Sequence, residues 1–281
     1  MTHLLFEDAA GNKISTQNFN DAFTSVEAHD AEILYIHSGL TFGKPNNELR
    51  PRQLLQELDS AIQTLDVPTL AFPTFTFSFC NGLDFDIQNS KSQMGALNEF
   101  VRKDPAAVRS NDPLMSVVVR GDDKSIITDL GKSSIGENST FDKLSRKNKV
   151  KFMFLGVELG DCFTYMHYLE WVAKSAYRYD REFTGKVIDN GSVSTQTYEL
   201  FVRYNGVFPN RASYQYGDYL EEKGFLKRAK IGDSFVSVVD LEPASEIYLD
   251  WIKRDPNCFI TEPFVREQVD TEFNVENMVA L

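Results

Sequence analysis

Cysteine is scarce in this chain, and the few cysteines form no pattern. Only three occur among the 281 residues, Cys80, Cys162 and Cys258, and no two of them form a CxxC pair. A disulfide framework needs an even set of cysteines, and a structural zinc site needs closely spaced pairs. The sequence therefore indicates neither scaffold and predicts a protein of a reducing compartment, the cytoplasm.

Long apolar runs and an excess of basic residues are also missing. No stretch approaches the length of about 18 apolar residues that predicts a transmembrane helix, and the first residues lack the regions of a signal peptide. The formal net charge is −12, whereas nucleic-acid binding requires clustered lysine and arginine. We expect no contact with membranes and no nucleic-acid partner.

Three common catalytic motifs are absent. No Walker A spacing occurs, and no GxGxxG motif follows an expected strand, so nucleotide hydrolysis and dinucleotide redox chemistry are disfavoured. The GxSxG motif of α/β-hydrolases is missing as well.

Hydrophobic periodicity predicts alternating strands and helices. Residues 32–37 indicate a buried strand, residues 54–65 a helix and residues 69–79 a strand that runs into a loop, and such a unit is typical of a parallel sheet. A hairpin over 183–205 with its turn at Asn190-Gly191 opens a C-terminal part that continues with helices to about 255. We predict one α/β domain over residues 1–281, with a mixed, largely parallel central sheet flanked by helices and an antiparallel C-terminal addition.

The segment Thr164-Tyr-Met-His167-Tyr-Leu-Glu170 holds the strongest candidate for chemistry. It follows the apolar run 150–157, which predicts a buried strand ending in a glycine turn. Residues three apart on a helix are neighbours, so the Glu170 carboxylate can orient the His167 imidazole and stabilise its protonated form. The pair is typical of a general base with its orienting acid, although a helix with a half-buried histidine has the same pattern.

Two other interpretations of His167 have less support. A metal site needs further ligands, yet the only other histidines are His3, His29 and His37, and no second Glu-x-x-His element exists. A Cys162–His167 nucleophile is disfavoured, because a turn and a helix would point these side chains apart. We expect no metal.

Small residues follow several expected strands and form three turns, Ser38-Gly39, Arg109-Ser110 and Ser139-Thr140. Backbone N–H groups exposed in such turns, or at a helix N-terminus, favour anions such as phosphate. Each turn alone is a weak indication of a ligand site.

Five segments resemble, in order and approximate spacing, the aminoglycoside 3-N-acetyltransferase family, also called the antibiotic N-acetyltransferase family. They are His37-Ser-Gly-Leu40-x-x-Gly43, Pro73-Thr-Phe-Thr76, Arg109-Ser110-x-x-Pro113-x-x-Ser116, Gly136-x-x-Ser139-Thr-Phe-x-x-Leu144, and Phe154-Leu-Gly-Val157 followed by Thr164-x-x-His167-x-x-Glu170. Single segments are unspecific, whereas five in register over about residues 30–175 are hard to obtain by accident.

The resemblance implies an enzyme that moves acetyl directly from acetyl-CoA to the amine of a small-molecule acceptor, without a metal. It implies His167 as the general base, Glu170 as its partner and Thr164 as the threonine beside them. The cofactor-side positions that match the family are His37, Ser38, Gly39, Leu40, Thr74, Phe75, Arg109, Ser110, Ser116, Ser139, Thr140 and Phe141.

The acceptor stays open. The family usually has histidine where this chain has Asp112, and asparagine where it has Phe163. Asp84 and Asp86 of a long substrate-side loop over about 80–95, with Asp112 and Tyr165, are the candidates to contact the acceptor. The alternatives are an aminoglycoside, as in antibiotic resistance, an amino sugar of surface-polysaccharide biosynthesis, and a catalytically silent binding protein of the same fold. The sequence also leaves a homodimer open.

Overall fold

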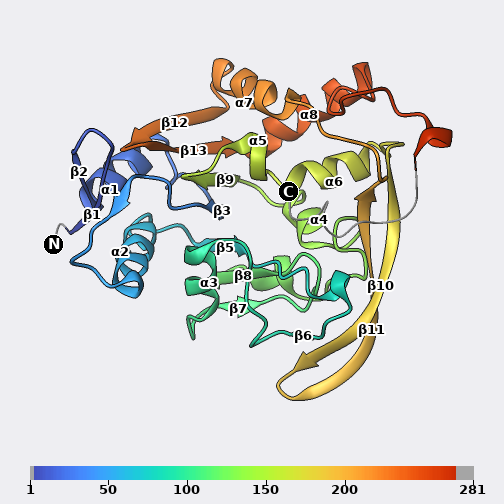
Figure 1. Cartoon of the computed structure of the whole chain (residues 1–281), viewed down its shortest axis with the longest axis horizontal. Coiled ribbons are helices and arrows are strands. Elements are labelled where there is room, and N and C mark those ends of the chain that lie inside the picture. The colour runs from blue at the N-terminus through green and yellow to red at the C-terminus, as the bar shows by residue number, and fades with distance from the viewer. Residues whose placement is uncertain (1–2, 270–281) are drawn as a thin grey trace.

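A seven-stranded mixed sheet forms the centre of the molecule within residues 3–269, the part of the chain that the computed structural model describes (Figure 1). Across the sheet its strands are β12 (Leu226–Ile231), β13 (Ser234–Asp240), β9 (Val150–Leu155), β3 (Ile33–Ser38), β5 (Thr69–Pro73), β8 (Val117–Gly121) and β7 (Val108–Arg109). The central strands β9, β3 and β5 run parallel, and antiparallel strands extend the sheet on both sides. The predicted mixed α/β fold is confirmed.

Alternation along the buried strands sends apolar side chains to both faces of this sheet. In β3, Leu34 and Ile36 belong to one core, whereas Ile33 and Tyr35 belong to the other. Both faces are therefore apolar and must be covered, as is usual where a sheet has parallel strands at its centre.

The first third of the chain covers one face. Helices α1 (Thr16–Ser25), α2 (Pro51–Gln63) and α3 (Ala96–Arg102) place Phe19, Leu58 and Leu97 in the core on this side. Helix α2 connects β3 to β5, which confirms the predicted strand–helix–strand unit. A small sheet of β2 (Lys13–Ser15), β1 (Leu4–Glu7) and β4 (Lys44–Pro45) packs on the same core through Phe6.

Later segments cover the other face. Phe141, Leu169, Tyr216 and Tyr248 join the core there from the helices α4 (Thr140–Leu144), α6 (Tyr165–Val172), α7 (Ala212–Glu222) and α8 (Leu241–Arg254). The remaining short turns of helix are η1 (Phe79–Asn81), η2 (Lys124–Ile127), α5 (Leu159–Cys162) and η3 (Arg266–Gln268). Among residues 3–269, no helix is long and apolar enough to cross a membrane.

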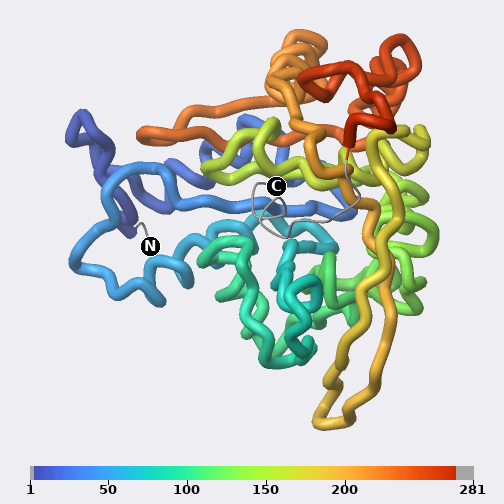
Figure 2. Tube along the Cα trace, turned by 45° about the vertical axis from the view of Figure 1, so that its right-hand side comes forward, coloured from blue at the N-terminus to red at the C-terminus, as the bar shows by residue number. Residues whose placement is uncertain are grey.

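A long hairpin of β10 (Arg178–Asp189) and β11 (Ser192–Arg203) follows α6 and turns at Asn190 and Gly191. Both turn residues have positive φ, 47° and 83°, which the predicted Asn-Gly turn supplies at little cost. The far end of the hairpin projects from the body of the molecule (Figure 2). Strand β6 (Phe85–Asp86) pairs with β10 toward that far end, so the loop over 80–95 lies along the hairpin.

Candidate active site

Helix α6 carries the predicted pair at the end of the central strand β9. The chain leaves β9 through Gly156, which has a φ of 73° and whose lack of a side chain leaves room for the carbonyl of Gly39 in the turn after β3. It then passes through α5 into α6. His167 and Glu170 lie one turn apart on α6, and His167 Nδ1 is 3.0 Å from Glu170 Oε2. The predicted contact between imidazole and carboxylate is present.

Two residues at the base of the hairpin complete this cluster, and sequence reasoning missed both. Arg178 Nε lies 2.7 Å from Glu170 Oε2, and its terminal NH2 lies 2.8 Å from His167 Nδ1. Tyr177 donates its hydroxyl to Glu170 Oε1 over 2.7 Å. Both oxygens of the carboxylate are therefore occupied, which fixes the plane of Glu170 beside the imidazole.

Burial and Arg178 set the charges of this cluster. Burial alone would raise the pKa of Glu170, but Arg178 and His167 outweigh it and lower that pKa to about 2. Burial, together with Arg178, lowers the pKa of His167 to about 4, although Glu170 acts in the opposite direction. At neutral pH the site therefore holds a carboxylate, a guanidinium and a neutral imidazole, the form in which histidine can accept a proton.

The two neighbours of His167 Nδ1 favour different tautomers. Glu170 accepts a hydrogen bond from a protonated Nδ1, whereas Arg178 donates one to a bare Nδ1. Only the bond to Glu170 leaves the other ring nitrogen, Nε2, without a proton. A base at Nε2 thus requires that Glu170, rather than Arg178, be the partner of Nδ1.

A small cavity of about 100 Å³ opens beside this cluster. Two buried hydroxyls that line it, of Thr164 and Tyr248, have no hydrogen-bond partner within the described part of the chain. The wall is formed by α5, α6, the base of the hairpin and the C-terminal segments. Its residues are Gly160, Asp161, Cys162, Phe163, Thr164, Met166, His167, Glu170, Arg178, Arg203, Pro209, Asn210, Ser213, Tyr248, Phe259 and Ile260.

Cys162 shares this cavity with His167 but is not prepared as a nucleophile. Its thiol donates to the Glu158 carbonyl over 3.2 Å, and burial, with Asp161 and Glu158 nearby, raises its pKa. The thiolate is the reactive form of cysteine, so a thiol with a raised pKa is unreactive at neutral pH.

The turn after β3 lies at the same edge of the sheet, because β3 and β9 are parallel neighbours. Ser38 donates its hydroxyl to Asn98 Oδ1 over 2.7 Å, and Leu40 packs, partly buried, against the core that α1, α2 and α3 cover. The ring of His37 is buried and stacks on Phe154, with 5.6 Å between ring centroids. Burial lowers the pKa of His37 to about 3, so this histidine is a neutral part of the core.

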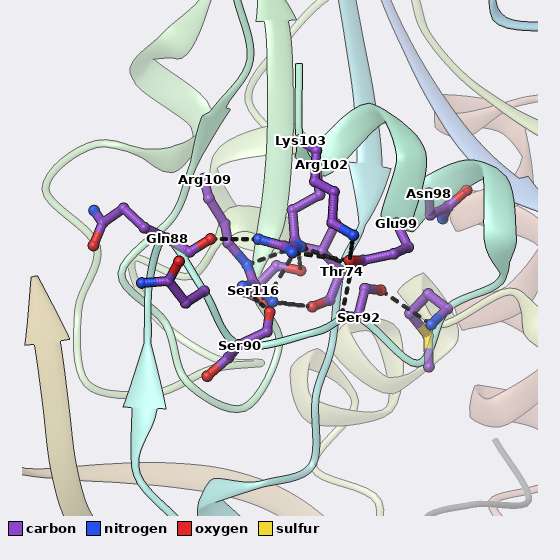
Figure 3. A network of polar contacts seen from close by, with 12 residues as sticks. Thr74, Gln88, Ser90, Ser92, Asn98, Glu99, Arg102, Lys103, Arg109 and Ser116 are labelled. Atoms are coloured by element: carbon purple, nitrogen blue, oxygen red, sulfur yellow. Dashed lines mark hydrogen bonds and ion pairs between the residues drawn. The ribbon is translucent and has the colours of Figure 1, made fainter. Parts of the chain in front are cut away.

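Arg109 is the centre of a second polar network, in which Thr74 and Ser116 take part (Figure 3). Its guanidinium donates to the carbonyls of Ser90 and Thr74 over 2.7 and 2.5 Å, and Phe75 packs in the core next to Thr74. Burial, with Arg102 nearby, lowers the pKa of Arg109 to about 9. Arg109 thereby ties the loop over 80–95 to β5 and β8.

Glu99 forms the other half of the network in Figure 3. Its carboxylate accepts hydrogen bonds from Arg102 over 2.7 and 2.9 Å and from the backbone N–H of Ser92 over 2.9 Å. Arg102 also donates to the carbonyl of Gln88 over 2.5 Å. Helix α3 and Arg109 therefore hold the loop from two sides.

We expect Arg109→Lys to release this loop. An ammonium cannot reproduce the forked contacts of the guanidinium, so several charge-assisted hydrogen bonds are lost. Trypsin should then cut after the exposed Lys91 roughly tenfold faster than in the wild type. Arg52→Lys, a matched change at an exposed position of α2, should leave the rate unchanged. Equal rates for both variants would refute the anchoring role.

The remaining cofactor-side positions are buried and already have structural contacts. Ser110 accepts from the backbone N–H of Val117 over 2.9 Å, and Ser139 caps α4 by accepting from that of Asp142 over 3.1 Å. Phe141 packs in the core, and the buried hydroxyl of Thr140 has no partner among residues 3–269. Neither turn takes part in the wall of the His167 cavity.

The structure does not bring the four expected acceptor residues to the His167 cavity. Asp84 and Asp86 lie at or next to β6, toward the far end of the hairpin. The partner of β6 on β10 is about ten residues from Arg178, which corresponds to roughly 30 Å along the strand. Asp112 is buried and accepts from the backbone of the turn at Leu114 and Met115 and from Ser134, and burial raises its pKa. Tyr165 is part of the core.

Metal ligands do not gather at any point of residues 3–269, where no group of three or more histidine, cysteine, aspartate or glutamate side chains is placed to hold an ion.

Known proteins share this fold. The chain matches the model of the aminoglycoside 3-N-acetyltransferase family over residues 51–253, and no curated protein sequence matches it. It is similar to apo aminoglycoside acetyltransferase AAC(3)-IVa, with 19% identity and a TM-score of 0.68 over 88% of this chain and 92% of that one. It is also similar to AAC-IIIb in a binary complex with CoASH, with 17% identity and a TM-score of 0.72 over 89% of this chain and 98% of that one. For AAC-VIa bound to sisomicin the identity is 15% and the TM-score 0.71, over 85% of this chain and 97% of that one.

The family match spans more than half of the chain and includes the elements that carry His167, Glu170, Arg178 and Arg203. The fold similarity extends over most of the chain and most of each neighbour. The chain therefore belongs to the aminoglycoside 3-N-acetyltransferase family.

Proposed function

We propose that this protein is an acetyl-CoA-dependent N-acetyltransferase that acetylates an amine of an aminoglycoside or amino sugar by direct transfer. The observation that carries the proposal is the neutral imidazole of His167, held by Glu170 at the wall of a cavity at the end of β9. Such an arrangement suits a general base.

The reaction needs one proton acceptor and one oxyanion donor. The amine nitrogen attacks the thioester carbonyl carbon, and His167 Nε2 takes the proton that the nitrogen loses as the C–N bond forms. Glu170 stabilises the imidazolium, and the unpartnered hydroxyl of Thr164 is available to donate to the oxyanion of the tetrahedral intermediate. The C–S bond then breaks, and the proton on His167 passes to the departing thiolate. The thioester is already activated, so no acyl-enzyme is required.

The turn at Ser38–Leu40 is the proposed receptor of the coenzyme arm. It lies at the C-terminal ends of the parallel strands β3 and β9, which is where ligands bind in open α/β sheets. The backbone N–H of Gly39 donates to the carbonyl of Leu155 over 2.8 Å, which joins this turn to the end of β9. A coenzyme lying over this edge would direct its thioester toward His167. A structural neighbour in a binary complex with CoASH supports coenzyme A as the carrier of the acetyl group.

The acceptor can be of two chemical kinds. Neighbours bound to sisomicin support an aminoglycoside, and an amino sugar of surface-polysaccharide biosynthesis is the alternative. A catalytically silent binding protein of the same fold would keep the cavity without turnover.

Thiol release from acetyl-CoA tests the proposal. We expect release that depends on an added amine, with one N-acetylated product per thiol by mass spectrometry. Slow release without amine is the hydrolysis background and serves as the control. A protein that binds acetyl-CoA but releases no thiol with any aminoglycoside or amino sugar would be the silent binding protein instead.

A further inference from the structure

Arg203 lies at the last position of β11, directly across the hairpin from Arg178. Residues that face each other across an antiparallel pair lie on the same side of the sheet, and like charges in this arrangement are destabilising. Both arginines line the His167 cavity. The hairpin therefore brings two guanidinium groups to one wall of the site.

The charge of Arg178 is balanced and that of Arg203 is not. Arg178 pairs with Glu170 over 2.7 Å. The side chain of Arg203 takes part in no ion pair or hydrogen bond within residues 3–269, and burial, with Arg178 nearby, lowers its pKa. The other carboxylate in the wall, Asp161, accepts the hydroxyl of Tyr214 instead. Within residues 3–269, one cation at this site is therefore left without a partner.

A further group points to the same ligand chemistry. The hydroxyl of Tyr248 is fully buried and lacks a partner in the described chain while it lines the cavity. Buried polar groups are nearly always hydrogen-bonded, so an unpaired one in a cavity marks a place for a bound group. Together, Arg203 and Tyr248 offer the N–H and O–H donors that an anion requires.

We propose that Arg203 binds an anionic group, a phosphate or a carboxylate, of the acceptor amine. This inference rests on the proposed function and narrows its substrate class to amino sugars that carry a negative charge. The phosphates of coenzyme A are separated from the thioester by the pantetheine arm, so an anion beside the base belongs to the acceptor or to the acyl group.

The charges around the cavity agree with this class. A polycation would bring further positive charge against Arg203. Asp84 and Asp86, which could have attracted a polycation, lie by β6 and not in the cavity wall.

The test uses thiol release by the full-length protein with amines that differ in one charged group: glucosamine, glucosamine 6-phosphate, muramic acid, and sisomicin as a polycation. We expect kcat/KM for an anionic amine to exceed that for glucosamine roughly 30-fold or more. Arg203→Gln should abolish this preference mainly through KM, with the KM for acetyl-CoA unchanged. Arg203→Lys should keep part of it, and Arg211→Gln, a matched change outside the cavity wall, should keep all of it.

Other results would contradict the anion site, its assignment to the acceptor, or the proposed function itself. Preference for glucosamine or sisomicin, or an Arg203→Gln defect that is equal for all amines, overturns the anion site and leaves the acetyltransferase intact. A preference that follows a carboxylate on the acyl donor, tested with succinyl-CoA, overturns the assignment to the acceptor. No release with any amine overturns the proposed function. The melting temperature of Arg203→Gln should not fall, since the change relieves a like-charge pair, and a clear fall would make Arg203 structural.

Discussion

His167→Ala is expected to lower kcat roughly 10²–10⁴-fold, because the amine then loses its proton to water instead of to a positioned base. The side chain lines the cavity, and its replacement leaves space without removing an apolar core contact. The loss should therefore appear in turnover and not in folding. The measurement is amine-dependent thiol release at saturating acetyl-CoA.

Two controls separate chemistry from binding. The dissociation constant of acetyl-CoA, measured by calorimetry, should change little in His167→Ala, because the coenzyme arm is proposed to lie on the turn after β3. His29→Ala removes an exposed histidine outside the site and should retain full activity. A fully active His167→Ala enzyme would rule out the proposed mechanism.

The central part of the fold could be predicted because its strands carry strong signals. The apolar runs of β3, β5 and β9 indicate buried strands, and one helix between β3 and β5 indicates a parallel pair. Strand β12 was missed for a physical reason. It is an edge strand that pairs with one neighbour only, and it carries Lys227, Arg228 and Lys230. Charged residues are common on edge strands, and here they remove the apolar alternation from which a strand is predicted.

The base and its orienting acid could be predicted because they lie on one helix, where sequence spacing fixes geometry. The pairing of Arg178 with Arg203 across the hairpin could also be predicted from the sequence, although less directly. A two-residue turn at Asn190-Gly191 fixes the register of the hairpin, so Arg178 must face Arg203. Their distance from His167 and Glu170 depends on how the hairpin packs on α6, which no local pattern encodes.

Glu170→Gln should lower turnover by roughly 10²–10⁴-fold, although the change replaces only one oxygen. A glutamine amide can donate to His167 Nδ1 and so favour the tautomer that carries its proton on Nε2, which cannot act as the base. The same change leaves Arg178 buried without a countercharge and should reduce the free energy of unfolding by about 3 kcal/mol. Urea denaturation measures this loss, and Glu246→Gln, at an exposed position of α8, is the matched control.

The double variant Glu170→Gln/Arg178→Met separates the two roles of the carboxylate. Removing the unpaired guanidinium should restore most of the stability, whereas turnover should stay low because Nδ1 still lacks its acceptor. Acid sensitivity gives a second readout. Arg178 and His167 hold the pKa of Glu170 at about 2, below its ordinary 4.5, so its contribution to wild-type stability is complete above pH 4.5 and is lost as the pH falls toward 2. The double variant should lack this loss. If its turnover recovered along with its stability, Glu170 would serve only to balance Arg178, and the orientation of His167 would have another cause.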